Sequence, residues 1–223
     1  PSRSAGRLRY RPPASPAARR AARAARASES VTMPTIITHA VVGLGLGRLF
    51  TARPMPRVWY WDVLVILAIL PDIDVLAFRF GIPYEAMLGH RGFTHSVPFA
   101  WVVGGLAAAI CYRRCQVRFW DLWGLFFVVT VSHGLLDACT HGGGEGVGFL
   151  IPFDEERFWS PWRPVMVSQM GLHFFESTRA LETLWSEFIW ICLPLGLVVG
   201  VVEVIRWVRR APGEHSPPTD ESV

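Results

Sequence analysis

Five long apolar stretches dominate this sequence of 223 residues. They run approximately over residues 35–50, 58–78, 97–112, 119–139 and 186–208. An α-helix needs about 20 apolar residues to cross a hydrocarbon core of about 30 Å, and the last three stretches approach that length. We therefore expect an all-α fold: a polytopic membrane bundle of about five apolar helices with an extramembrane loop.

The first two stretches differ from the others. The first is short and contains Gly43, Gly45 and Gly47, so it can pack closely against other helices. The second is interrupted by Pro71 and two aspartates, which a helix facing lipid does not tolerate. We expect the end of the second stretch to face protein or water. Residues 140–185 are polar and aromatic, and we expect them to form the extramembrane loop.

The composition supports a membrane protein and excludes several other classes. Apolar residues make up 51% of the chain and charged residues 18%, whereas an average soluble domain has about 25% charged residues. This balance excludes a disordered chain, a coiled coil and a disulfide scaffold. The four cysteines form no CxxC motif, and we expect them to be small buried hydrophobic residues.

The net charge of +4 comes from the start of the chain. Residues 1–32 contain eight of the 22 basic residues and a single acid, Glu29. We expect residues 1–32 to be a disordered arm outside the functional protein, residues 33–210 to be the membrane-embedded domain, and residues 211–223 to be a disordered tail. Because the excess positive charge lies in the arm, we expect no nucleic-acid partner.

Arginines near the ends of the stretches predict an orientation in the membrane. An up-and-down path brings nine of them to one side, namely Arg48, Arg53, Arg57, Arg113, Arg114, Arg118, Arg206, Arg209 and Arg210. The positive-inside rule makes that side cytoplasmic. The other ends of the stretches then lie on the extracytoplasmic side of a multi-pass protein.

Seven residues of metal-ligand type fall on this extracytoplasmic side, namely His39, Asp72, Asp74, His90, His95, His133 and Asp137. His133 and Asp137 are spaced i, i+4, which places them on one helix face with Cβ atoms about 6 Å apart. An aspartate in hydrocarbon costs about 2.5–3.5 kcal/mol, and a metal ion would remove that cost. For this pair alone, a hydrogen bond at a helix end is the alternative.

Asp72 and Asp74 follow Pro71 at a break in the second stretch. Either aspartate alone would be interpreted as a helix N-cap. Two carboxylates in an apolar context need cations, so we expect at least one of them to bind metal, with Asp72 able to bridge two ions.

The sequence GHRGFTHS, residues 89–96, combines several functional side chains. His90 and His95 supply two ligand nitrogens, and Thr94 supplies a hydroxyl. Arg91 supplies a planar fork that binds phosphate or carboxylate. Two loop histidines alone are more often surface residues, but the glycines, the arginine and the neighbouring acidic helix ends favour metal ligation.

The motifs LPDID, GHRGFTHS and SHGLLDACT, in this order and separated by apolar helices, resemble the YdjM-like family of predicted membrane-bound metal-dependent hydrolases of bacteria. The resemblance covers nearly all of Met33 to Trp207. It implies a bacterial inner-membrane (plasma-membrane) hydrolase and places the presumed metal residues of the family on the seven ligands above. The family is also distantly similar to zinc-dependent phospholipase C and P1 nuclease, which hold several zinc ions with His and Asp.

We therefore expect metal-assisted hydrolysis with one to three divalent ions, foremost zinc. Arg91, Asp74 and Thr94 are the expected catalytic residues, with Arg91 holding the developing negative charge. The expected partners are the lipid bilayer and a small-molecule or lipid substrate. A phosphoester is the favoured substrate, and an amide or a carboxylic ester stays open.

Two other functional classes would use the same metal-ligand residues. A divalent-metal transporter or sensor predicts polar residues that continue through the bilayer, but the inner halves of the second, third and fifth stretches are apolar. A structural membrane protein with vestigial ligands is the third interpretation.

Overall fold

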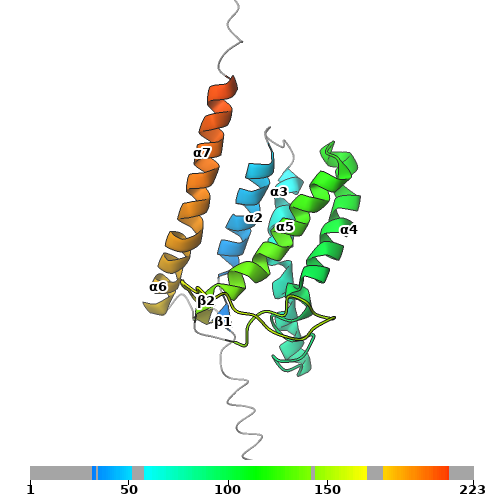
Figure 1. Ribbon diagram of the computed structural model, residues 1–223, viewed down its shortest axis with the longest axis vertical. Helices are drawn as coiled ribbons and strands as arrows, with labels where there is room; N and C mark the ends of the chain where they lie inside the picture. Colours follow the sequence, from blue (N-terminus) through cyan, green and yellow to red (C-terminus); the bar gives the residue numbers. More distant parts are fainter. Residues whose placement is uncertain (1–31, 34, 52–57, 142–143, 170–177, 211–223) are drawn as a thin grey trace, which may run out of the picture. The chain divides into compact units, whose positions relative to one another are not determined.

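The computed structural model describes residues 32–33, 35–51, 58–141, 144–169 and 178–210. All of them belong to one unit of the chain, residues 32–223. They are mostly helical, which confirms the all-α part of the predicted fold (Figure 1). The predicted arm of residues 1–32, apart from Thr32, and the predicted tail of residues 211–223 lie outside the described residues.

The helices follow the predicted up-and-down path (Figure 1). Helices α2 (Ile36–Phe50) and α4 (Val97–Cys115) run in one direction, and α3 (Val58–Ile69) and α5 (Phe119–Ala138) return. A longer helical run then follows, made of α6 (Thr178–Glu187), a π-helical turn at Phe188–Cys192, and α7 (Leu193–Arg210). The C-terminal ends of α2, α4 and α7 lie together at one end of the bundle. The sequence predicted that the arginines near these helix ends gather on one side, and the path of the helices agrees with that prediction.

The second apolar stretch is broken where the sequence predicts. Helix α3 ends at Ile69 and continues as the 3-10 segment η1 (Leu70–Phe80), in which Pro71 occupies the first turn. Proline has no N–H, so Pro71 cannot donate to the carbonyl groups three and four residues before it. Gly81 follows η1 as its C-cap, and the lack of a side chain favours its φ of 74°. A second short 3-10 segment, η2 (Phe93–His95), precedes α4.

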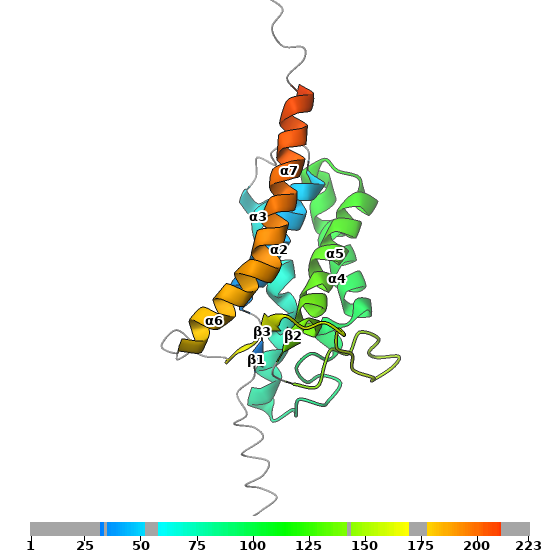
Figure 2. The same cartoon turned by 60° about the vertical axis from the view of Figure 1, so that its left-hand side comes forward.

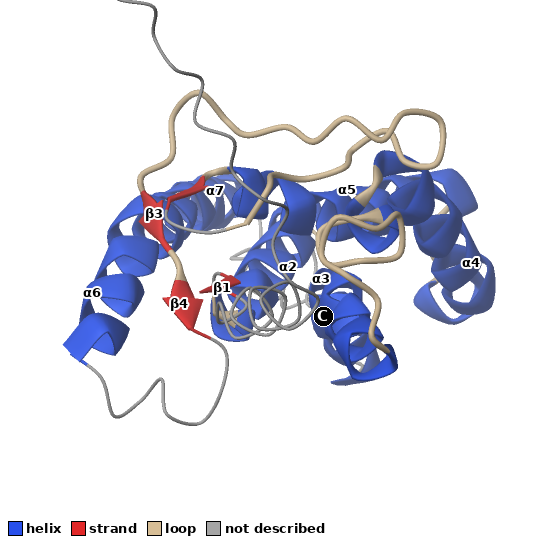
Figure 3. Cartoon of the chain, turned by 90° about the horizontal axis from the view of Figure 1, so that it is seen from below, coloured by secondary structure: helices blue, strands red, loops and turns tan. Residues whose placement is uncertain are grey.

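Residues 140–185 contain more regular structure than the predicted loop. Strand β1 (Thr32–Met33) pairs antiparallel with β4 (Ser168–Gln169), and β2 (Thr140–His141) pairs parallel with β3 (Val165–Met166). Helix α6 begins within this segment, at Thr178. Figure 3 shows the strands between α6 and α2, at the end of the bundle where α2 begins. Four two-residue strands thus tie the loop to the helices.

The apolar core lies where α5 packs against both α3 and α4, and Figure 2 shows α4 and α5 side by side. It is built from Tyr60, Leu64, Leu67, Ala68, Ala108, Cys111, Leu122, Leu125, Phe126 and Val129. Glycines allow the closest approaches: a Cβ at Gly104 would lie 2.7 Å from the backbone nitrogen of Phe127, and one at Gly43 would lie 2.8 Å from Cβ of Ala68. The close packing expected for the glycine-rich first stretch is therefore confirmed.

Two helices in the described part of the chain are long and apolar enough to cross a membrane, Phe119–Ala138 and Ala180–Arg209. Length and composition thus support a membrane-spanning role for two of the about five predicted membrane helices. Helix α2 has 15 residues and α3 has 12, which gives lengths of about 22 and 18 Å at 1.5 Å per residue. These lengths fall short of a hydrocarbon core of about 30 Å.

Residues of the helical run α6–α7 form hydrogen bonds at both ends of α2. At one end, Arg206 donates to the backbone carbonyl oxygens of Arg48, Leu49 and Thr51 at 2.6–2.9 Å. Such carbonyls at a helix end otherwise have no partner within the helix. At the other end, the buried Glu187 accepts hydrogen bonds from the backbone N–H and the hydroxyl of Thr35 and from the hydroxyl of Thr38, at 2.5–2.7 Å.

Candidate metal centre

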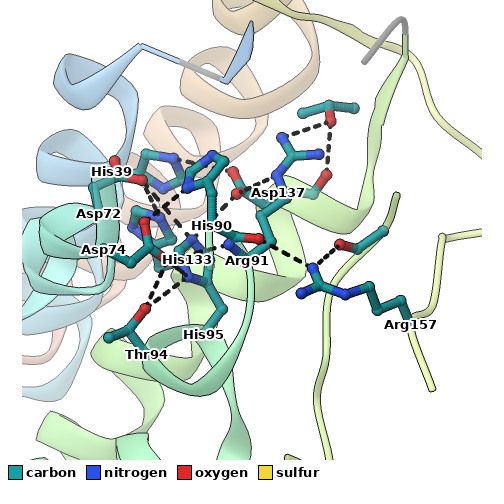
Figure 4. Close-up of polar contacts among 12 residues, drawn as sticks. His39, Asp72, Asp74, His90, Arg91, Thr94, His95, His133, Asp137 and Arg157 are labelled. Atoms are coloured by element: carbon teal, nitrogen blue, oxygen red, sulfur yellow. Dashed lines mark hydrogen bonds and ion pairs between the residues drawn. The ribbon is translucent and has the colours of Figure 1, made fainter. Parts of the chain in front are cut away.

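Six histidines and aspartates meet at the end of the bundle where α2 begins (Figure 4). We call them the His/Asp cluster: His39 of α2, Asp72 of η1, His90 of the loop before η2, His95 of η2, and His133 and Asp137 of α5. The Asp72 side chain is 8% exposed, and the other five residues are at most 2% exposed. Segments far apart in the sequence therefore supply one buried polar cluster.

The ligand atoms of the cluster are close enough to share ions. Three groups each have ligand atoms within 4.8 Å of one another: His39, Asp72 and His133; Asp72, His90 and His95; and His95, His133 and Asp137. Zinc ligands lie about 2.0–2.2 Å from the ion, so ligands of one ion lie within about 4.4 Å of one another. The spacing of each group is close to this range.

Hydrogen bonds turn the Nε2 atoms of three histidines toward the cluster. His133 donates its Nδ1 proton to the carbonyl oxygen of Ala68 at 2.7 Å. The Nδ1 atoms of His90 and His95 face Asp74 at 2.7 and 3.0 Å. A carbonyl or an ionised carboxylate only accepts, so each Nδ1 carries a proton, and in the neutral ring that binds a metal each Nε2 offers its lone pair. This second contact is typical of metal-binding histidines.

Asp74 lies behind the histidines instead of among the ligand atoms of the cluster (Figure 4). Besides His90 and His95, it accepts hydrogen bonds from the backbone N–H of Arg91 at 3.1 Å and from the Thr94 hydroxyl at 2.8 Å. Burial raises the pKa of the Asp74 carboxyl, but its hydrogen bonds with His90 and His95 lower that pKa well below its usual range. Both Asp74 and Thr94 therefore contact the histidines from outside the cluster.

Arg91 is fully buried and contacts the cluster through Asp137. Its Nε donates to Asp137 Oδ2 at 2.9 Å, and its Nη2 donates to the Thr140 hydroxyl at 3.3 Å. The guanidinium also lies over the ring of Trp159, 5.3 Å from the ring centroid. Arg91 has a φ of 60°, which is uncommon outside glycine, Asn and Asp. The backbone thus adopts a rare conformation at Arg91, the positively charged residue of the GHRGFTHS motif.

Buried polar atoms without hydrogen-bond partners gather in the cluster. Within the described residues they are both ring nitrogens of His39, both carboxylate oxygens of Asp72, Nε2 of His90, His95 and His133, and Oδ1 of Asp137, together with the Tyr84 hydroxyl. Each unsatisfied buried polar group costs about 1–3 kcal/mol. Ligation of a divalent cation would satisfy these atoms, so the donor set fits such an ion.

The electrostatic field of the cluster favours a positive charge. Burial lowers the pKa of His95, but its contacts with Asp137 and Asp74 outweigh burial and raise that pKa to about 10. Asp72 adds a third carboxylate, with Oδ1 3.8 Å from Nε2 of His95. The same negative field favours a bound cation.

Arg157 is a supporting residue that the sequence motifs do not reveal. It donates to the backbone carbonyl oxygens of His90, Tyr84 and Ala86 at 3.0–3.2 Å. These contacts hold the loop that carries His90 (Figure 4). Because backbone carbonyls are the partners, no pattern of side chains predicts the contact. The carbonyl of Ala68, which orients His133, was missed for the same reason.

Comparison with known proteins identifies close relatives. A sequence model of the family described as YdjM inner membrane protein matches residues 33–208. Inner membrane protein YbcI of Escherichia coli (strain K12) is 41% identical over 182 residues, which are 80% of this chain and 99% of that protein. YfhP of Bacillus subtilis (strain 168) is 31% identical over 118 residues, which are 49% of this chain and 36% of that protein. No solved structure matches, and the distant similarity to phospholipase C and P1 nuclease stays a prediction.

Proposed function

The chain belongs to the YdjM family of inner membrane proteins, and we propose that it is a membrane-bound metal-dependent hydrolase whose His/Asp cluster holds one to three divalent ions, foremost zinc. One observation carries this proposal: buried Nε2 and carboxylate oxygen atoms without hydrogen-bond partners face one another in the cluster. Mixed His and Asp ligands suit zinc better than magnesium or calcium, which prefer oxygen ligands.

A divalent ion in the cluster would supply Lewis acidity and lower the pKa of water toward 7. The residues of the chain prepare that chemistry. Asp74 orients His90 and His95 through their Nδ1 atoms, and Thr94 holds Asp74. Arg91 donates a hydrogen bond to the buried Asp137 and fixes its orientation. We therefore assign Asp74, Thr94 and Arg91 roles in positioning the ligands.

The favoured substrate is a phosphoester, with phosphoesters of lipids included. Helix α5, which carries His133 and Asp137, is one of two helices among the described residues that are suited to cross a membrane. The cluster lies toward the end of α5 opposite to the ends of α2, α4 and α7 that carry Arg48, Arg113 and Arg206. By the positive-inside rule, the cluster of this multi-pass protein faces the extracytoplasmic side.

The alternative function is a divalent-metal transporter or sensor with the same ligands. A transporter needs a polar route from the cluster to the other side of the membrane. The described core between α3, α4 and α5 is instead filled by apolar side chains such as Leu64, Leu125 and Phe126, none more than 6% exposed. This packing favours chemistry at the cluster over transport through the bundle.

The test compares metal content and hydrolysis in purified protein. We expect zinc-loaded protein to hydrolyse members of a phosphoester panel, and we expect both a chelator and His133→Ala to abolish that hydrolysis. His141→Ala is the matched control, because His141 is exposed and lies outside the cluster. Bound zinc without hydrolysis of any phosphoester, combined with zinc uptake into proteoliposomes, would contradict the hydrolase and support the transporter.

A further inference from the structure

The chemistry of the six ligands limits how ions can share the His/Asp cluster. A neutral imidazole with a protonated Nδ1 has one lone pair, on Nε2, and binds one ion. A carboxylate has two oxygens, so it can bind two ions at once. A histidine that belongs to two ligand groups can therefore serve only one of them at a time, whereas an aspartate can serve both.

Because the three ligand groups share residues, only one pair of groups can bind ions at the same time. The first group (His39, Asp72 and His133) shares only Asp72 with the second (Asp72, His90 and His95). The third group (His95, His133 and Asp137) shares a histidine with each of the others. The first and second groups can be filled together, because their shared residue is a carboxylate. The third group cannot be filled together with either of them.

We propose, on the basis of the metal centre above, that the cluster is a two-ion site bridged by Asp72. His39 and His133 bind one ion, and His90 and His95 bind the other. This partition uses each histidine once. It leaves Asp137 beside both ions, with its Oδ1 3.6 Å from Nε2 of His39 and its Oδ2 3.4 Å from Nε2 of His95.

Contacts link the members of each pair. The rings of His39 and His133 stack at a centroid distance of 3.8 Å and an angle of 15°. His90 and His95 are held as a pair by the two oxygens of Asp74. Asp72 lies between the pairs, because its Oδ1 is 3.3 Å from Nε2 of His133 and 3.8 Å from Nε2 of His95. Neither oxygen of Asp72 has a hydrogen-bond partner among the described residues.

The charges indicate what a two-ion site would bind. One divalent ion together with Arg91 balances the three aspartates at the site, Asp72, Asp74 and Asp137, while the histidines remain neutral. A second ion leaves two positive charges in a buried environment, where uncompensated charge is costly. An anionic group must then accompany the second ion, and hydroxide from metal-bound water meets that requirement when no other anion is present. A phosphoester dianion can take the place of hydroxide, whereas a neutral amide or carboxylic ester brings no negative charge.

The number of bound ions tests this proposal without any measurement of activity. After zinc loading and removal of excess metal, elemental analysis should find two ions per chain in the wild type and in His141→Ala. His39→Ala and His90→Ala should each retain one, since each removes a ligand from a different pair. One ion in the wild type would overturn the two-ion site but leave the proposed metal centre intact, and no bound ion would overturn both.

Manganese provides a second readout that needs no variant. Two Mn²⁺ ions that share Asp72 should give a spin-coupled electron paramagnetic resonance spectrum in the wild type. Inorganic phosphate should tighten binding of the second ion severalfold. Two independent ions with uncoupled spectra would contradict the Asp72 bridge, and unchanged binding of the second ion with phosphate would contradict phosphate as the accompanying anion.

Discussion

His133 donates its Nδ1 proton to the carbonyl oxygen of Ala68, 2.7 Å away, at the end of α3. Pro71 follows three residues later and cannot donate to this carbonyl. The proline that ends the apolar helix thus also leaves an acceptor for a histidine on α5. A break in one helix fixes the orientation of a ligand on another.

Asp74→Asn should weaken metal binding while leaving the ligands in place. An amide has one acceptor oxygen and one donor group, so it cannot accept from His90 and His95 together. We expect zinc affinity to fall about 10–100-fold, as is typical when the outer partner of a metal ligand is lost. Competition with a chromophoric chelator measures this change.

Thr94→Val is the comparison for Asp74→Asn, because it removes only one donor to Asp74. Its effect on zinc affinity should be smaller. Equal affinities in the wild type and in Asp74→Asn would show that Asp74 does not orient the histidines.

Arg91→Met should destabilise the metal-free protein strongly. The substitution leaves the carboxylate of Asp137 buried without its cationic partner, 2.9 Å away, and loss of one partner of a buried pair costs about 3–5 kcal/mol. A metal ion near Asp137 would replace part of the lost charge, so zinc should stabilise the variant more than the wild type. Thermal unfolding with zinc and with chelator measures both effects, and equal zinc-induced shifts would contradict this role of Arg91.

Glu187→Gln should affect the metal centre from a distance. Glu187 accepts three hydrogen bonds from Thr35 and Thr38 at the start of α2, and His39 follows Thr38 directly. The amide keeps only one acceptor oxygen, so we expect a loss of about 1–3 kcal/mol in stability and weaker zinc binding. Glu182→Gln is the control, because Glu182 lies on the same helix but is exposed. Unchanged zinc affinity in Glu187→Gln would limit this residue to a structural role.

The orientation in the membrane is testable with reporters at the C-terminus. Because the ends of α2, α4 and α7 carry the arginines, we expect this side to be cytoplasmic. A C-terminal fluorescent protein should then fluoresce, and a C-terminal alkaline phosphatase should be inactive. The opposite pattern would place the His/Asp cluster in the cytoplasm.

The sequence predicted the helical path well, because the lengths of the apolar stretches and the break at Pro71 follow from local chemistry. The sequence also predicted that the metal ligands lie close together, because an up-and-down path brings every second helix end to the same side of the bundle. The sequence did not reveal that Asp74 lies behind His90 and His95, because two aspartates spaced i, i+2 look alike until the 3-10 turn directs them apart. Nor did it reveal Arg157 or the Ala68 carbonyl, whose contacts depend on backbone atoms.

The exact boundaries of the apolar helices were also beyond sequence patterns alone. The apolar stretch at residues 58–78 counts as one long segment in the sequence, but Pro71 divides it into α3 and η1. Conversely, the stretch at residues 186–208 extends toward the N-terminus through α6, because a π-helical turn joins α6 to α7.

The central claim is that histidines and aspartates of the cluster hold divalent ions, and the zinc K-edge X-ray absorption spectrum of the purified, zinc-loaded protein tests it most directly. We predict nitrogen and oxygen ligands at about 2.0–2.2 Å, with the multiple-scattering pattern of imidazole, and loss of part of that pattern in His133→Ala. Sulfur ligands at about 2.3 Å would instead place the metal on cysteines. That result, or the absence of bound zinc after loading, would contradict the metal centre.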